Sequence, residues 1–165
     1  MLRTRNHPRA FTLIELIIVM VIICIALAVA APSLSGWNRG SRLRDASDQF
    51  LTLTRWTRAQ AIATSKVHRI NVDAQTGRYF VSAQDGLEFV PVASHFGEEF
   101  FVPEGAVIEI TDEQSQSLDF IAFYPTGRTT PRNVRLADDQ GQFDIVCQTP
   151  AEGFRILKPG EVIQP

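Results

Sequence analysis

Cysteine is scarce in this 165-residue sequence, which has two of them. Cys24 lies inside a long apolar run, and Cys147 lies near the far end of the chain. A disulfide needs its two Cα atoms within about 7 Å, and residues in such different surroundings are poor partners. We expect both to be small buried hydrophobic residues. Cysteine usage therefore neither proves nor excludes an oxidising compartment.

The motifs of common catalytic and metal sites are also missing. The sequence has no G-x-S-x-G, no H-E-x-x-H and no phosphate-binding loop. Of the three histidines, His7 is among the first ten residues, and His68 and His95 are too few and too far apart to suggest a metal centre. We therefore expect a protein that is not an enzyme and that holds no cofactor or metal.

An excess of basic residues is absent as well, because the formal net charge is −2. The first ten residues contain Arg3, Arg5 and Arg9 and no acid, which leaves thirteen basic against eighteen acidic residues in the rest. A net acidic domain is a poor general binder of nucleic acid, although a local basic patch could exist.

What the sequence does have is one long apolar run at residues 9–32, whose only charge after Arg9 is Glu15. Residues 11–31 reach the length of about 20 that a membrane-crossing helix needs. The arginines before them predict a cytoplasmic N-terminus and export of the remainder. The "AVAAP" at the end of the run also fits the cleavage site of a secretory signal, and removal after Ala31 is the alternative. A charge at bilayer depth costs about 2.5–3.5 kcal/mol, so Glu15 calls for a functional explanation.

The stretch "FTLIEL", between a short basic leader and an apolar helix, resembles the class III signal of type IV pilins and type II secretion pseudopilins. The resemblance implies that a prepilin peptidase cuts between Ala10 and Phe11, that the Phe11 amine is methylated, and that the helix stays in the mature protein. The family normally has Gly before the cut, so Ala10 bears on the efficiency of cleavage. Pro32 stands where such proteins often have a helix-bending proline, which removes one helical hydrogen bond.

The same resemblance suggests a role in assembly for Glu15. In this family the equivalent carboxylate is thought to pair with the N-terminal amine of a neighbouring subunit in the filament. A buried carboxylate is tolerable beside an opposite charge and costly without one. The alternative is that Glu15 lies shallow enough to reach the membrane interface and has no role.

The period of the sequence predicts an α+β fold. Apolar residues at three- and four-residue spacing predict that the helix continues amphipathically over residues 32–66: Leu43, Ala46, Phe50, Leu53, Thr57 and Ala61. The whole helix would run from about Thr12 to about Ser65, bent or loosened between Pro32 and Gly40. After it, alternating runs predict seven or eight strands over 67–165, with turns at 74–77 and 138–141. We expect a long N-terminal helix, transmembrane in its first half, packed on an antiparallel β-sheet domain.

The run "FYPTGR", followed by a hairpin and "GFRIL", resembles the C-terminal region of the GspH/FimT group. The resemblance implies a minor pseudopilin of a type II secretion system, at or near the tip of a periplasmic pseudopilus. It would be a single-pass inner-membrane protein with a periplasmic domain. Its partners would be the prepilin peptidase, other major and minor pseudopilins and the inner-membrane assembly platform.

Two other functions stay open at this point. One is a FimT-like minor type IV pilin that acts in pilus biogenesis or DNA uptake. Some such relatives bind DNA through a G-R-x-R stretch, and here "GFRILK" keeps Arg155 and Lys158 but has Phe154 in place of the first arginine. The other is a membrane-tethered domain of unrelated function. Some pseudopilins bind calcium through loop carboxylates, but "DDQG" at 138–141 lacks EF-hand spacing, and we expect a solvated turn.

Overall fold

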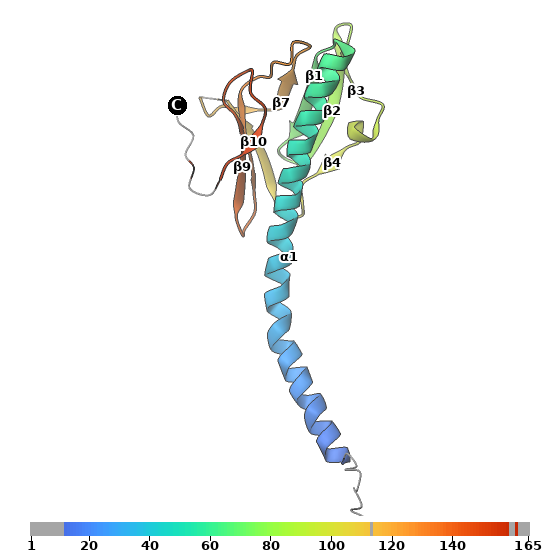
Figure 1. Cartoon of the computed structure of the whole chain (residues 1–165), viewed down its shortest axis with the longest axis vertical. Helices are drawn as coiled ribbons and strands as arrows, with labels where there is room; N and C mark the ends of the chain where they lie inside the picture. The colour runs from blue at the N-terminus through green and yellow to red at the C-terminus, as the bar shows by residue number, and fades with distance from the viewer. Residues whose placement is uncertain (1–11, 113, 159–160, 162–165) are drawn as a thin grey trace, which may run out of the picture. The chain divides into compact units, whose positions relative to one another are not determined.

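The computed structural model describes residues 12–112, 114–158 and 161, apart from the side chains of residues 28–40 and 95 (Figure 1). The chain divides into two compact units, residues 1–38 and 39–165. The helix α1, Leu13–Thr64, contributes to both.

In the first unit, α1 starts directly after Thr12, whose Oγ1 accepts a hydrogen bond from the Glu15 N–H at 3.3 Å. A side-chain oxygen at this position satisfies one of the backbone donors that the first turn of a helix leaves free. The helix continues through Pro32, and the predicted bend there stays a prediction. Within residues 12–112, 114–158 and 161, no helix combines the length and apolar character that crossing a membrane requires.

In the second unit, α1 covers the sheets with the stripe that the sequence predicts. The side chains of Leu43, Ala46, Phe50, Leu53, Thr57 and Ala61 are all buried. Thr57 fits in this apolar stripe because its hydroxyl donates to the Leu53 carbonyl oxygen at 2.7 Å. The helix was expected to end at about Ser65 and ends at Thr64. Its end is marked by Ser65, which has a φ of 54°.

The strands form two antiparallel sheets. Their bounds are β1 His68–Asp73, β2 Arg78–Asp85, β3 Glu88–Pro91, β4 Phe100–Phe101, β5 Val107–Thr111, β6 Ser117–Leu118, β7 Phe120–Phe123, β8 Arg132–Ala137, β9 Gln142–Cys147 and β10 Arg155–Ile156. The first sheet has the order β3-β2-β1-β7, with β4 also paired to β2, and the second has the order β10-β9-β8-β5-β6. A 3-10 turn, His95–Gly97, lies between β3 and β4.

The described chain therefore has ten strands, and the predicted count of seven or eight was wrong. Two stretches of the sequence each contain two strands that join different sheets. The run at 100–111 gives β4 to the first sheet and β5 to the second, with a break at Gly105, where φ is 84°. The run at 117–123 gives β6 to the second sheet and β7 to the first. Alternation of apolar residues does not reveal such a change of sheet. The α+β class and the packing of the helix on antiparallel sheets are confirmed.

One hydrophobic core joins the helix to both sheets. Phe50 of α1 meets Tyr79 of β2 edge to face, with ring centroids 5.3 Å apart. Buried residues of the second sheet, including Ile108 and Leu136, belong to the same cluster. The Tyr79 hydroxyl hydrogen-bonds to Gln49 Oε1 at 3.4 Å, and burial raises the pKa of Tyr79 to about 12. The helix is therefore the element around which the two sheets share their apolar faces.

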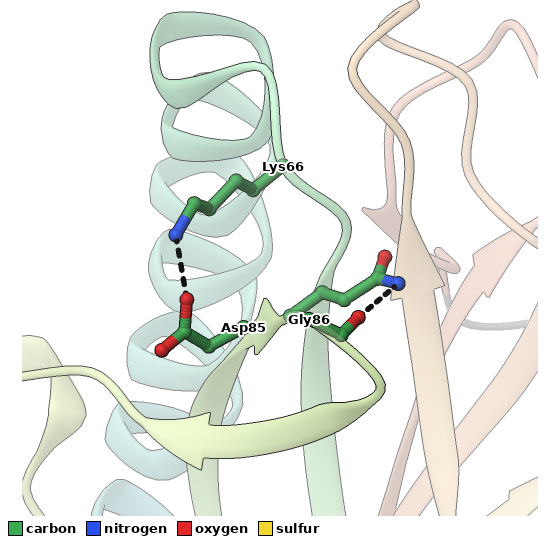
Figure 2. A network of polar contacts seen from close by, with 4 residues as sticks. Lys66, Asp85 and Gly86 are labelled. Atoms are coloured by element: carbon green, nitrogen blue, oxygen red, sulfur yellow. Dashed lines mark hydrogen bonds and ion pairs between the residues drawn. The ribbon is translucent and has the colours of Figure 1, made fainter.

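Polar contacts set the turns around this core. After α1, the Lys66 ammonium pairs with Asp85 Oδ1 at 3.2 Å, next to the turn where Gln84 Nε2 donates to the Gly86 carbonyl oxygen (Figure 2). Both partners of the Lys66–Asp85 pair are exposed, so the pair contributes little to stability. The predicted turn at 74–77 is present, and Gly77 has a φ of 67° there.

The helix–sheet contact leads to a prediction on stability. Phe50→Ala should lower the free energy of unfolding by about 3–5 kcal/mol, because the residue is fully buried and truncation leaves a cavity. Guanidinium unfolding of the full chain in detergent micelles measures the change. Leu87→Ala is the control, since Leu87 is 100% exposed and should change stability by less than about 0.5 kcal/mol. Equal losses in the two variants would contradict this account of the core.

Candidate assembly site

The first unit presents an apolar surface that none of the described residues covers. Twelve large apolar side chains of residues 12–27 are 44–77% exposed: Leu13, Ile14, Leu16, Ile17, Ile18, Val19, Met20, Val21, Ile22, Ile23, Ile25 and Leu27. Eight of them are consecutive, from Leu16 to Ile23, so they surround the helix on every side. A helix that is apolar all round is stable only inside lipid or among other helices.

Glu15 is the only charged residue between 12 and 27, and it lies in the first turn of α1. A carboxylate there is close to the positive end of the helix macrodipole. The spacing of Thr12 and Glu15 is that of a capping box, T-x-x-E, in which the first side chain caps the helix. Sequence reasoning missed this local role of Thr12, although the spacing was readable.

The other predicted residues of this segment, or their side chains, lie outside the part of the chain that the structure describes. Ala10 and Phe11 lie outside the described residues, as does His7. The side chain of Pro32 is outside them too. Cleavage after Ala10 and the pairing of Glu15 with a Phe11 amine therefore stay predictions.

The C-terminal basic residues lie in the second unit, next to an acid that sequence reasoning missed. Arg155 Nη1 is 2.8 Å from Glu161 Oε1, and the backbone N–H of Lys158 donates to Glu161 Oε2 at 3.2 Å. These hydrogen bonds lower the pKa of Glu161, and the bond from the Lys158 backbone has a larger effect than the bond from Arg155. The Arg155 charge thus has a counter-ion within its own chain, which leaves less of it for a phosphate.

The described residues hold no group of three or more His, Cys, Asp or Glu arranged to bind a metal ion. His68 is a buried strand residue whose Nδ1 lies 3.1 Å from the Lys66 carbonyl oxygen. Asp138 Oδ1 accepts hydrogen bonds from the backbone N–H groups of Gln140 and Gly141. That geometry closes the β8–β9 hairpin and fits the turn expected at 138–141.

The two cysteines differ in their surroundings. Both are free, and Cys147 is buried as expected. Its Sγ lies 3.3 Å from the Thr149 carbonyl oxygen. Burial and the nearby Glu152 raise the pKa of the Cys147 thiol. The expectation that Cys24 is also buried was wrong for the described chain, because Cys24 lies on the apolar helix surface and is exposed.

Comparison with known proteins finds similarity in sequence. Residues 5–31 match the prokaryotic N-terminal methylation motif. Over 75 residues the chain is 37% identical to type II secretion system protein H of Xanthomonas campestris pv. campestris. The aligned residues make up 46% of this chain and 44% of that relative. The match therefore spans less than half of the relative's length.

Solved structures share the fold. The minor pseudopilin EpsH from the type 2 secretion system of Vibrio cholerae has a TM-score of 0.63 at 14% identity, covering 73% of this chain and 99% of that one. The type IV minor pilin FimU of Pseudomonas aeruginosa has a TM-score of 0.58 at 10% identity, covering 78% and 97%. At such identities the likeness shows the fold alone.

The chain thus combines a match to the N-terminal methylation motif with the fold of pilin-like proteins. The relative in Xanthomonas campestris that shares 37% of aligned residues with this chain is protein H of a type II secretion system.

The environment of Cys147 predicts a slow thiol. In a Cys24→Ser variant, iodoacetamide should modify folded Cys147 at least about tenfold more slowly at pH 8 than the urea-unfolded chain. A raised pKa means less thiolate at any given pH, so the rate should begin to rise at a higher pH than for an ordinary cysteine. The measurement is the rate of mass increase between pH 7 and pH 10. Equal rates in the folded and unfolded chains would contradict the buried position.

Proposed function

We propose that this protein is a minor pseudopilin of a type II secretion system, a structural component at or near the tip of the periplasmic pseudopilus, and not an enzyme. The observation that carries the proposal is the helix surface of residues 12–27, apolar all round, with one carboxylate in its first turn. The methylation motif, the protein H relative and the pilin-like fold support it.

The apolar helix would serve in two environments in turn. Before assembly, residues 11–31 would lie in the inner membrane, with the leader in the cytoplasm and residues 67–165 in the periplasm. In the filament the same side chains would pack against the helices of neighbouring pseudopilins. Lipid tails are about as apolar as leucine side chains, so this exchange has little hydrophobic cost, and packing and polar contacts decide where helices meet.

Glu15 would provide such a polar contact. After a prepilin peptidase has cut between Ala10 and Phe11, the methylated Phe11 amine of a neighbouring subunit would be its partner. A buried carboxylate without a partner is strongly unfavourable, whereas a paired one is tolerated. The pair would therefore set where one helix stops along the next. The inner-membrane assembly platform would be the place at which this insertion occurs.

A minor type IV pilin is the second candidate, because the fold is also that of FimU. Fold likeness does not separate the two machines, but the curated relative belongs to the secretion system. Within the second candidate, DNA capture through Arg155 and Lys158 has less support, because Arg155 is paired with Glu161. The third alternative, a membrane-tethered domain of unrelated function, gives Glu15 no partner.

The role of Glu15 gives the first test. Glu15→Gln should insert into the inner membrane as well as the unmodified protein, because it removes a charge from an apolar segment. Its incorporation into filaments should fall by about tenfold or more, since an interaction of more than about 1.4 kcal/mol is lost. The measurement is the amount of the protein in sheared filaments relative to the membrane fraction.

Asp48→Asn is the matched control. Asp48 is an exposed carboxylate on the same helix, in the second unit, and the described contacts of Asp48 involve only its backbone carbonyl, which accepts from Thr52. This variant should enter filaments normally. Entry of the Glu15→Gln protein at the unmodified level would sink the proposed role of Glu15.

Processing gives the second test. Co-expression with a prepilin peptidase should yield a mature chain that begins at Phe11 and carries one added methyl group, read by intact-protein mass spectrometry. Ala10→Gly should raise the processed fraction, because glycine lets the backbone approach an active site more closely. Ala26→Gly changes an alanine outside the cleavage site and should have no effect. A mature chain that begins at Pro32 would show a secretory signal instead.

A further inference from the structure

The face of the first sheet that points away from α1 carries an arginine between two phenyl rings. Inward residues of β1 and β2, such as Ile70 and Val81, are buried in the core under the helix. Arg69 lies between these inward positions along β1 and so projects to the opposite face. Its guanidinium carbon is 3.7 Å from the ring centroid of Phe89 and 4.3 Å from that of Phe120.

The two rings reach the Arg69 guanidinium from different strands of the sheet. Phe89 comes from β3 and Phe120 from β7, at the two ends of the strand order β3-β2-β1-β7. The residues directly opposite Arg69 on the neighbouring strands are small, Ser82 on β2 and Ala122 on β7. Small residues at these two positions give the long arginine side chain room to lie across the sheet.

The charge of Arg69 has no counter-ion among the described residues. Its Nε is buried and has no hydrogen-bond partner there. Other cations of the same domain are paired, as in Lys66–Asp85, Arg78–Glu99, Arg135–Asp144 and Arg155–Glu161. Four exposed or half-exposed cations thus have acidic partners, whereas Arg69, which lies against two phenyl rings, has none among the described residues.

A guanidinium that packs against aromatic rings can still form hydrogen bonds along its edge. That edge presents parallel N–H groups, which match the two oxygens of a carboxylate. Phe80, on the same face of β2, adds a third half-buried ring. Arginine and aromatic residues are enriched among the side chains that dominate binding energy at protein interfaces.

We propose that this outer face, centred on Arg69, is a docking surface for an acidic side chain of a second protein. Charge complementarity identifies the partner's group as a carboxylate, and the flanking rings select apolar residues next to it. A nucleic acid is the poorer fit, because the chain after residue 10 carries thirteen basic and eighteen acidic residues and repels a polyanion. The surface is separate from the Glu15 contact, so either can fail without the other.

Site-specific photocross-linking of the full chain in cells that make its secretion machinery tests the proposal. The photoreactive residue replaces Gln84, which is half-buried on the same face, opposite Phe89. Mass spectrometry should map the adduct to a protein segment with an Asp or Glu within a few residues of the linked position. Arg69→Gln should lower the adduct yield by about fivefold or more, in keeping with a loss of about 1 kcal/mol. Arg135→Gln, which removes an already paired arginine of the second sheet, should leave the yield unchanged.

A charge exchange makes the result specific. Arg69→Glu should abolish the adduct, and changing the mapped acid of the partner to Arg should restore it. Thermal unfolding of each variant in detergent separates docking from folding. If Arg69→Gln lowers the unfolding temperature but leaves the adduct yield unchanged, Arg69 only stabilises its own sheet and the proposal is wrong. An adduct with nucleic acid, an adduct on a segment without acids, or no adduct also overturns it.

Discussion

A helix surface that is apolar on every side has to be kept from water, and this constraint determines how the protein can exist. The exposed side chains of residues 12–27 include eight large apolar residues in succession, so no rotation of the helix against a single partner covers them all. Burying one such side chain is worth about 1.5–3 kcal/mol. A dozen of them outweigh the marginal stability of an ordinary domain, typically about 5–15 kcal/mol. Exposure of this surface to water is therefore unfavourable, and helices that are apolar on every side are ordinarily found in lipid or among other helices.

That constraint also explains why one carboxylate matters. Apolar helices slide along one another with little change in energy, because one leucine contact resembles the next. A charge that is tolerated only beside an opposite charge removes this degeneracy. Glu15 is well placed for the purpose, because it lies in the first turn, where Thr12 caps the helix start at a defined residue. A carboxylate in a frayed or variable first turn would define the position of the helix much less well.

How far the sequence predicts the structure depends on the range of the interactions involved. The stripe from Leu43 to Ala61 and the turns at 74–77 and 138–141 were predicted because spacing and turn chemistry are local. The changes of sheet between β4 and β5, and between β6 and β7, were missed because the alternation of apolar residues does not show which sheet a strand joins. Arg69 was missed for a related reason. Its ring partners lie on strands that meet it only through the sheet order, and nothing in the residues around it suggests a missing counter-ion.

The apolar helix surface of residues 12–27 and the sheet face around Arg69 would contribute differently to binding, and their chemistry explains the difference. An apolar helix suits every neighbour that presents a similar helix, so it brings affinity without much choice of partner. Selection among similar partners needs polar groups whose mismatch is costly. In the described domain several exposed cations form ion pairs with acids of the same chain. Because their charge is already balanced, these cations would gain little from an acid of another protein. Arg69, which lies close to the rings of Phe89 and Phe120 and has no acidic partner among the described residues, still has a charge to satisfy. A partner that presents a carboxylate there gains an ion pair, and one that presents a cation or an apolar side chain leaves a shielded charge unpaired, so the choice of partner rests on the sheet face.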